Sequence, residues 1–82
     1  MKVRIRIFPA AGIDKVPDEF EITPEKGCLS EVLALLRENL GLDPAENAAL
    51  MFLHNGQELD IRKEAVFQDG DQLWLLPLLS GG

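Results

Sequence analysis

Residues 29–41 read LSEVLALLRENLG and contain the clearest periodic pattern of the chain. The apolar side chains of this segment recur three or four positions apart, which is the spacing of one face of an α-helix: Leu29, Val32, Leu33, Leu36 and Leu40. Charged residues such as Glu31 and Arg37 fall outside this stripe. Gly41 suits the C-terminal cap of a helix, and Pro44 follows shortly after. The sequence therefore predicts one amphipathic helix that buries a single face.

Two strand patterns precede this helix. Residues 2–7 alternate basic and apolar side chains, which is the period of a half-buried strand. Residues 18–23 form a second run, in which Phe20 and Ile22 are expected to face inward and the glutamates between them outward. Glycine and proline separate the two runs, so we expect two strands before the helix.

Three further strand signals follow the helix. Residues 50–53 read as a short strand that leads into Asn55-Gly56. This dipeptide is a strong hairpin signal, because a type I′ turn needs positive φ at both central residues. Residues 57–59 are expected to return antiparallel. A second turn at residues 69–71 precedes the final strand, which we expect to run from Gln72 to about Leu78.

The order strand, strand, helix, strand, short strand, strand is typical of the α+β class. It predicts a β-grasp domain with a mixed sheet and one main helix packed on one face. The first and last strands are expected to lie side by side at the centre of the sheet. We expect residues 1–79 to form this domain and residues 80–82 to form a flexible tail.

Composition and charge exclude several classes of function. The chain has 82 residues, 46% of them hydrophobic, and a formal net charge of −6. Such an acidic chain is a poor match for nucleic acid, whose phosphates require a basic surface. Its N-terminus does not resemble a signal peptide, and no apolar run approaches the length of a membrane span. The single cysteine permits no internal disulfide. We expect a cytoplasmic protein without a membrane partner.

The C-terminal residues carry the functional signal. The chain ends Ser80-Gly81-Gly82, and the two glycines lack the Cβ that would hinder access to the terminal carboxylate. Such a carboxylate can enter a narrow channel and be activated there. The last third of the chain resembles the MoaD/ThiS family of ubiquitin-like sulfur carriers, and most closely the small subunit of molybdopterin synthase. The resemblance lies in the order of four features: Asn55-Gly56, the turn at residues 69–71, the apolar strand that ends at Pro77, and this tail.

This resemblance implies a carrier mechanism. An activating enzyme would use ATP to adenylate the carboxylate of Gly82, and a sulfur donor protein would convert the adenylate into a thiocarboxylate. Gly81 would keep the approach open, and the large subunit of molybdopterin synthase would receive the tail. No bound cofactor is implied, and the chain itself would not be an enzyme. The alternatives are a sulfur carrier for thiamine, a tungsten cofactor or tRNA thiolation, a modifier that forms isopeptide bonds through Gly82, or a plain interaction module.

The final strand provides a candidate partner surface. Trp74, Leu76 and Leu78 are expected on one sheet face, and Leu73, Leu75 and Leu79 on the other, yet one helix covers only one face. We therefore predict that a partner contacts five residues of this segment: Trp74, Leu76, Leu78, Leu79 and Ser80. Arg4 and Arg6 should lie on the same open face and are predicted to contact the partner as well. The alternatives are that residues 9–16 or 61–67 fold over this face, and that both arginines are simply solvated.

The remaining reactive side chains have simpler interpretations. Cys28 lies at the start of the helix, where the thiol pKa can be lowered, but it has no neighbouring cysteine, and we interpret it as structural or incidental. His54 is the only histidine, and a loop position beside the Asn55-Gly56 turn is expected. Asp69 and Asp71 are typical of a turn. No metal site is predicted.

Overall fold

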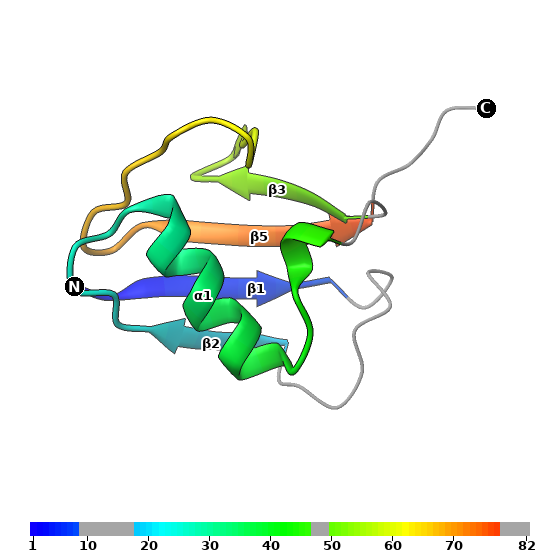
Figure 1. The fold of residues 1–82 in the computed structure, drawn as a ribbon, viewed down its shortest axis with the longest axis horizontal. Coiled ribbons are helices and arrows are strands. Elements are labelled where there is room, and N and C mark those ends of the chain that lie inside the picture. Colours follow the sequence, from blue (N-terminus) through cyan, green and yellow to red (C-terminus); the bar gives the residue numbers. More distant parts are fainter. Residues whose placement is uncertain (9–17, 47–49, 78–82) are drawn as a thin grey trace.

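A computed structural model of the 82-residue chain describes residues 1–8, 18–46 and 50–77 (Figure 1). The elements in chain order are β1 (Val3–Ile7), β2 (Glu19–Ile22), α1 (Leu29–Leu40), the short 3₁₀ helix η2 (Pro44–Glu46), β3 (Leu50–His54), β4 (Gln57–Glu58) and β5 (Gln72–Pro77). This sequence of elements is the predicted one, apart from η2 and shifts of one residue at strand ends. The predicted end of the last strand at Leu78 lies outside the described residues.

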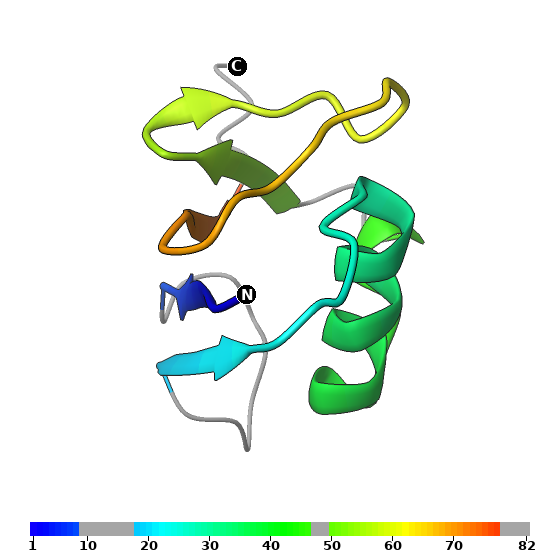
Figure 2. The same ribbon diagram turned by 90° about the vertical axis from the view of Figure 1, so that its left-hand side faces the viewer.

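The described strands form one sheet in the order β2-β1-β5-β3-β4. β1 lies beside β5 at its centre, as predicted. These two strands are parallel, and all other neighbours are antiparallel. Helix α1 lies across one side of the sheet (Figures 1 and 2). The fold is therefore an α+β β-grasp with a mixed sheet.

Helix α1 forms where the apolar stripe predicted it. Four residues of the stripe are buried: Leu29, Val32, Leu36 and Leu40. Gly41 ends the helix in the left-handed conformation, with φ 71°, and its N–H donates to the carbonyl of Arg37 at 3.0 Å. No helix in the described part of the chain is long and apolar enough to cross a membrane.

The entry into α1 is held by a carboxylate rather than by a side-chain cap. Cys28 is the N-cap residue and makes no capping hydrogen bond. Instead, the carboxylate of Glu31 accepts the backbone N–H groups of Glu25, Lys26 and Gly27 at 2.6, 2.9 and 2.8 Å. These hydrogen bonds lower the pKa of Glu31, and the bond from Glu25 has the largest effect. An acidic residue in the first turn also complements the helix dipole.

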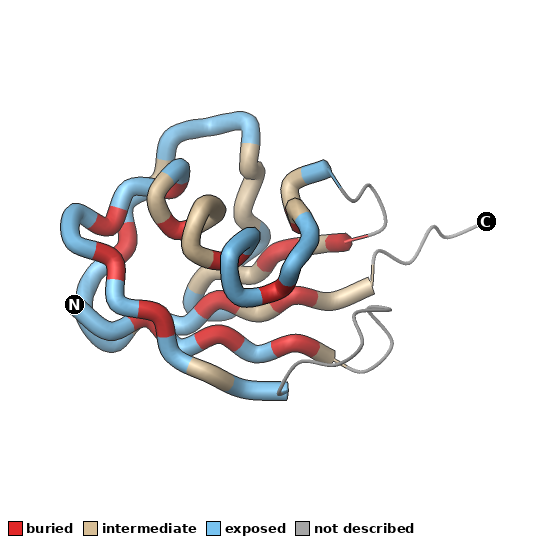
Figure 3. The backbone as a smooth tube through the Cα atoms, turned by 60° about the horizontal axis from the view of Figure 1, so that its bottom comes forward, coloured by how far each residue is buried: buried red, intermediate tan, exposed pale blue. Residues whose placement is uncertain are grey.

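The core lies between α1 and the sheet, and Figure 3 shows its buried segments. Its buried apolar residues come from every main element: Val3, Ile5, Ile7, Ile22, Leu29, Val32, Leu36, Leu40, Leu50, Phe52, Phe67, Leu73 and Leu75. Phe67 belongs to the connection before β5, where no strand or helix pattern announced a core residue. Its ring stacks on His54 at 4.1 Å between centroids, and its N–H donates to the carbonyl of Gly27 at 2.7 Å.

Two turns are joined by the carboxylate of Asp71. Asn55 and Gly56 both have positive φ, 52° and 84°, as the predicted hairpin turn requires. One oxygen of Asp71 accepts the backbone N–H of Gln68 at 2.9 Å and lies 2.7 Å from Nε2 of His54, and the other accepts the side chain of Asn55 at 3.1 Å. His54 is thus the last residue of β3, held in place, rather than a loop residue.

This network lowers the pKa of Asp71. Burial by itself raises that pKa, but the hydrogen bonds from Gln68, His54 and Asn55 outweigh it. The folded-state pKa is below the unfolded one, so the ionised carboxylate stabilises the fold above the unfolded pKa. That contribution is lost as the pH falls through the folded-state pKa.

We predict that Asp71→Ala lowers the free energy of unfolding by about 1–3 kcal/mol at pH 7, because it leaves three hydrogen-bond donors without their acceptor. Urea unfolding measures this cost. Below about pH 4, the usual pKa of an unfolded aspartate, the difference between wild type and variant should shrink. Glu38→Ala, on the exposed side of α1, is the matched control and should change stability by less than about 0.5 kcal/mol. An equal loss in both variants would contradict the assignment.

Candidate interaction surface

The two faces of the sheet have different surroundings. Helix α1 lies against one face, and the connection between β4 and β5 runs on the same side (Figure 2). Within this connection, Val66 forms a bridge with Cys28, and the carbonyl of Ala65 accepts the N–H of Leu29 at 3.0 Å. Residues 61–67 therefore pack beside the start of α1 and do not fold over the opposite face, and residues 9–16 lie outside the described residues. We call the opposite face the open face.

Strand registers place one continuous row of side chains across the open face. Glu19 on β2 lies opposite Arg6 on β1, and Arg6 lies opposite Trp74 on β5. Trp74 in turn lies opposite Leu53 on β3, and Leu53 opposite Glu58 on β4. The row therefore runs acidic, basic, aromatic, aliphatic, acidic from one edge of the sheet to the other.

Apolar side chains gather on the open face around Trp74. We define the open-face cluster as Phe8, Met51, Leu53, Trp74 and Leu76, all of which are partly exposed. Leu76 lies opposite Met51, and the rings of Phe8 and Trp74 are 5.6 Å apart between centroids. By contrast, Leu73 and Leu75 on the other face are fully buried. β5 thus contributes to the core on one side and to an apolar surface on the other.

One member of the open-face cluster, Leu76, is close in sequence to the C-terminal residues. Leu76 and Pro77 end β5, and the chain continues directly into residues 78–82. The predicted contact residues Leu78, Leu79 and Ser80, and the predicted reacting residues Gly81 and Gly82, lie outside the described residues. In the sequence, they follow Leu76 and Pro77 directly.

Both predicted arginines lie on the open face, each beside a glutamate of β2. Arg4 is 3.6 Å from Glu21, and Arg6 is 3.8 Å from Glu19. The guanidinium of Arg6 also lies over the ring of Phe8, 5.1 Å from its centroid. The arginines therefore border the open-face cluster along β1.

Three members of the cluster were missed by sequence reasoning. Phe8 continues the alternation of Arg4 and Arg6, and this parity could have placed it on the open face. Met51 and Leu53 belong to a run of four apolar residues, 50–53, so parity could assign their face only once the register with β5 was known.

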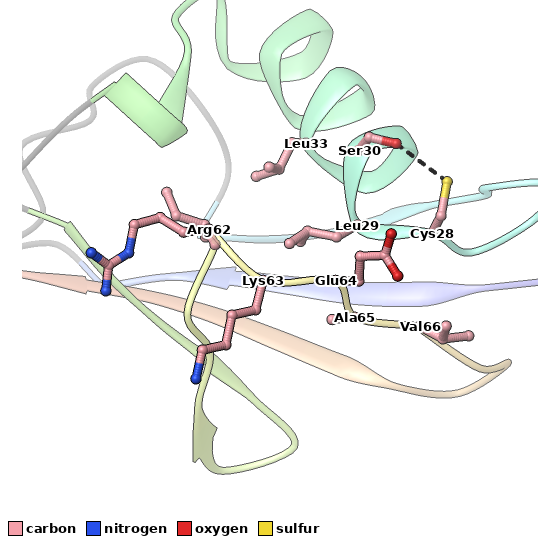
Figure 4. A pocket seen from close by; sticks show the side chains of 10 residues that line it. Cys28, Leu29, Ser30, Leu33, Arg62, Lys63, Glu64, Ala65 and Val66 are labelled. Atoms are coloured by element: carbon pink, nitrogen blue, oxygen red, sulfur yellow. Dashed lines mark hydrogen bonds between the residues drawn. The ribbon is translucent and has the colours of Figure 1, made fainter.

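A groove lies on the helix side of the sheet (Figure 4). It has a volume of about 450 Å³ and lies between the first turns of α1 and residues 61–66. Cys28 lines one end, with its sulfur 3.4 Å from the hydroxyl of Ser30, and this hydrogen bond lowers the pKa of the thiol. In the described residues, no group of three or more metal-ligating side chains is present at this groove or elsewhere.

The comparisons with known proteins agree on one fold. A chain from the complex of subunits 1 and 2 of molybdopterin-converting factor from Helicobacter pylori is 29% identical, with a TM-score of 0.68, and the match covers 100% of both chains. SAMP1 from Haloferax volcanii is 18% identical with a TM-score of 0.69, again over 100% of both chains. Small archaeal modifier protein 1 from Methanosarcina acetivorans is 24% identical with a TM-score of 0.62, over 99% of this chain and 96% of that one.

No family model matches the chain, and no curated protein matches it in sequence. The structural matches show that the chain has a ubiquitin-like fold of the MoaD/ThiS type, as its sequence predicted. The Helicobacter pylori neighbour, at 29% identity, supports a carrier role of the kind that the sequence predicted, and the two archaeal neighbours, both below 25% identity, support the fold alone.

Adjacent leucines of β5 provide a test of the open face. Leu75→Ala should lower the free energy of unfolding by about 2–5 kcal/mol, because that side chain is fully buried. Leu76→Ala should cost about 1 kcal/mol, because the side chain is already partly exposed. Chemical denaturation of both variants measures the difference. Equal costs would mean that Leu76 belongs to a covered core and that no open face exists.

Proposed function

We propose that this chain is a sulfur carrier and the small subunit of a molybdopterin synthase. The observation that carries the proposal is the likeness, over the whole length of both chains, to a subunit of molybdopterin-converting factor at 29% identity. The Gly81-Gly82 end agrees with it, since a carrier of this type reacts through its terminal carboxylate. The partners would be an ATP-dependent activating enzyme, a sulfur donor protein and the large subunit of the synthase.

The reaction would proceed in two steps on Gly82. Its carboxylate would attack the α-phosphate of ATP in the activating enzyme, forming an acyl-adenylate and releasing pyrophosphate. Sulfur at the oxidation level of sulfide, supplied by the donor, would then attack the acyl carbon, so that a C–S bond forms as the C–O bond to AMP breaks, and a thiocarboxylate is left. The chain would supply no catalytic group of its own: Gly81 and Gly82 lack a Cβ and let the carboxylate enter the enzyme's channel.

The open-face cluster would supply the docking energy. Its aromatic and aliphatic side chains are of the kind that anchor protein interfaces, and Trp74 stands at its centre. A partner that covers the cluster is next to the point at which the chain continues toward Gly82. Docking and delivery of the tail would therefore occur together, and the chain would bind no cofactor itself.

Intact mass spectrometry tests the carrier role. The chain would be incubated with the activating enzyme of its host, ATP and a sulfur donor. The expected result is a mass gain that corresponds to one oxygen exchanged for sulfur at Gly82. An unchanged mass, with an enzyme that is competent on a known carrier, would contradict the proposal. Conjugates to other proteins that disappear when Gly82 is deleted would instead favour a modifier.

The tail makes a separate prediction. Gly81→Val should reduce thiocarboxylate formation at least tenfold, because a β-branched side chain next to the reacting group restricts the backbone and obstructs a narrow channel. Thermal unfolding should be unchanged, since position 81 follows the last described strand. Glu38→Val, on the exposed side of α1, is the control and should retain the activity. A Gly81→Val chain that accepts sulfur at the wild-type rate would contradict the channel argument.

A further inference from the structure

The charges on the open face follow the strands. β1 contributes Arg4 and Arg6, which border the open-face cluster on one side. β2 contributes Glu19 and Glu21, one strand spacing farther out, about 4.8 Å away. On the other side of the cluster, Glu58 of β4 lies opposite Leu53. The cluster therefore has a positive border along β1 and a negative border along β4.

The ion pairs between β1 and β2 are too weak to account for this arrangement of charged side chains on the open face. Their closest N···O distances are 3.6 and 3.8 Å, and all four side chains are 45–57% exposed. Exposed pairs of this kind contribute little to stability. Arg6 is nevertheless positioned by the ring of Phe8, at 5.1 Å, so its guanidinium stays at the border of the cluster. Both arginines keep donors available for a second carboxylate.

The positive border stands out against the charge of the whole chain. The formal net charge is −6, with 14 acidic residues against 8 lysines and arginines. Elsewhere in the described residues, Arg37 pairs with Asp43 and Arg62 with Asp60. Overall attraction to a basic enzyme would favour no single orientation. The ordered borders of the cluster do favour one, because complementary charges fix the register of an interface.

We propose that the partner of the open face presents an apolar ridge bordered by a row of carboxylates, which contact Arg4 and Arg6. This inference rests on the proposed function and identifies the partner surface as that of the activating enzyme. If such a partner docked on the cluster in the opposite orientation, rotated by 180°, its carboxylates would lie beside Glu58. Repulsion between like charges would disfavour that orientation. The two arginines would thus select the orientation in which the tail is delivered.

The registers offer an exchange that isolates this effect. Arg4 lies opposite Glu21 and Arg6 opposite Glu19. The variant Arg4→Glu, Arg6→Glu, Glu19→Arg, Glu21→Arg therefore retains both cross-strand pairs and the net charge, but reverses the border of the cluster. The matched control is the exchange Arg37→Asp, Asp43→Arg, an ion pair at the far end of α1 with a comparable separation of 3.7 Å. Thermal unfolding of each variant checks that it is folded.

The measurement is pyrophosphate release by the host's activating enzyme with ATP and each chain as substrate, at low and at high salt. At low salt the exchange at the open face should raise KM for the chain at least tenfold with little change in kcat, and the difference should narrow at high salt. The control exchange should leave KM within twofold. If the four-residue exchange does not fold, Arg4→Gln with Arg6→Gln replaces it, with an expected severalfold rise in KM.

The outcomes separate the two proposals. The inference would be overturned if the wild-type chain is activated and a folded exchange or glutamine variant has a KM within twofold of the wild-type value at low salt. The proposed carrier function would not be affected by that result. A wild-type chain that is not activated, by an enzyme competent on a known carrier, would overturn the proposed function and this inference with it.

Discussion

Parallel pairing of β1 with β5 determines how the described elements are arranged. The two strands come from opposite ends of the chain and meet at the centre of the sheet, with Ile5 opposite Leu73 and Ile7 opposite Leu75. Parallel neighbours cannot be joined by a tight turn, so all the intervening chain must cross from one end of the sheet to the other. That crossing places α1 and residues 61–67 on one side and leaves the other side as the open face.

One strand therefore serves both the core and the surface. In β5, Leu73 and Leu75 are fully buried beneath α1, whereas Trp74 and Leu76 point to the open face and remain partly exposed. Because side chains alternate along a strand, neighbouring residues of this segment have separate roles. The residues that stabilise the domain and those proposed to bind a partner are thus one position apart, in the last described strand before the C-terminal glycines.

Local patterns were sufficient to predict the strands and the main helix, and long-range contacts explain why Phe67, Met51 and Leu53 were not assigned. The stripe of α1, the alternation of β1 and the positive φ of Asn55-Gly56 each follow from a few neighbouring residues, so they could be read directly. Phe67 is buried because it packs against His54 and Gly27, which are distant in sequence and have no pattern in common with it. The open face was predictable from β5, but the membership of Met51 and Leu53 depended on a register that no local signal specifies.

The central position of β5 also has a mechanical consequence. Its backbone is hydrogen-bonded to β1 on one side and β3 on the other, and it is the last described strand before the C-terminal glycines. A force that draws those glycines into an enzyme acts along the strand and loads both rows of hydrogen bonds in shear, so they share the load. An edge strand would instead peel away bond by bond. The domain can therefore resist traction on its own tail while a partner holds the end.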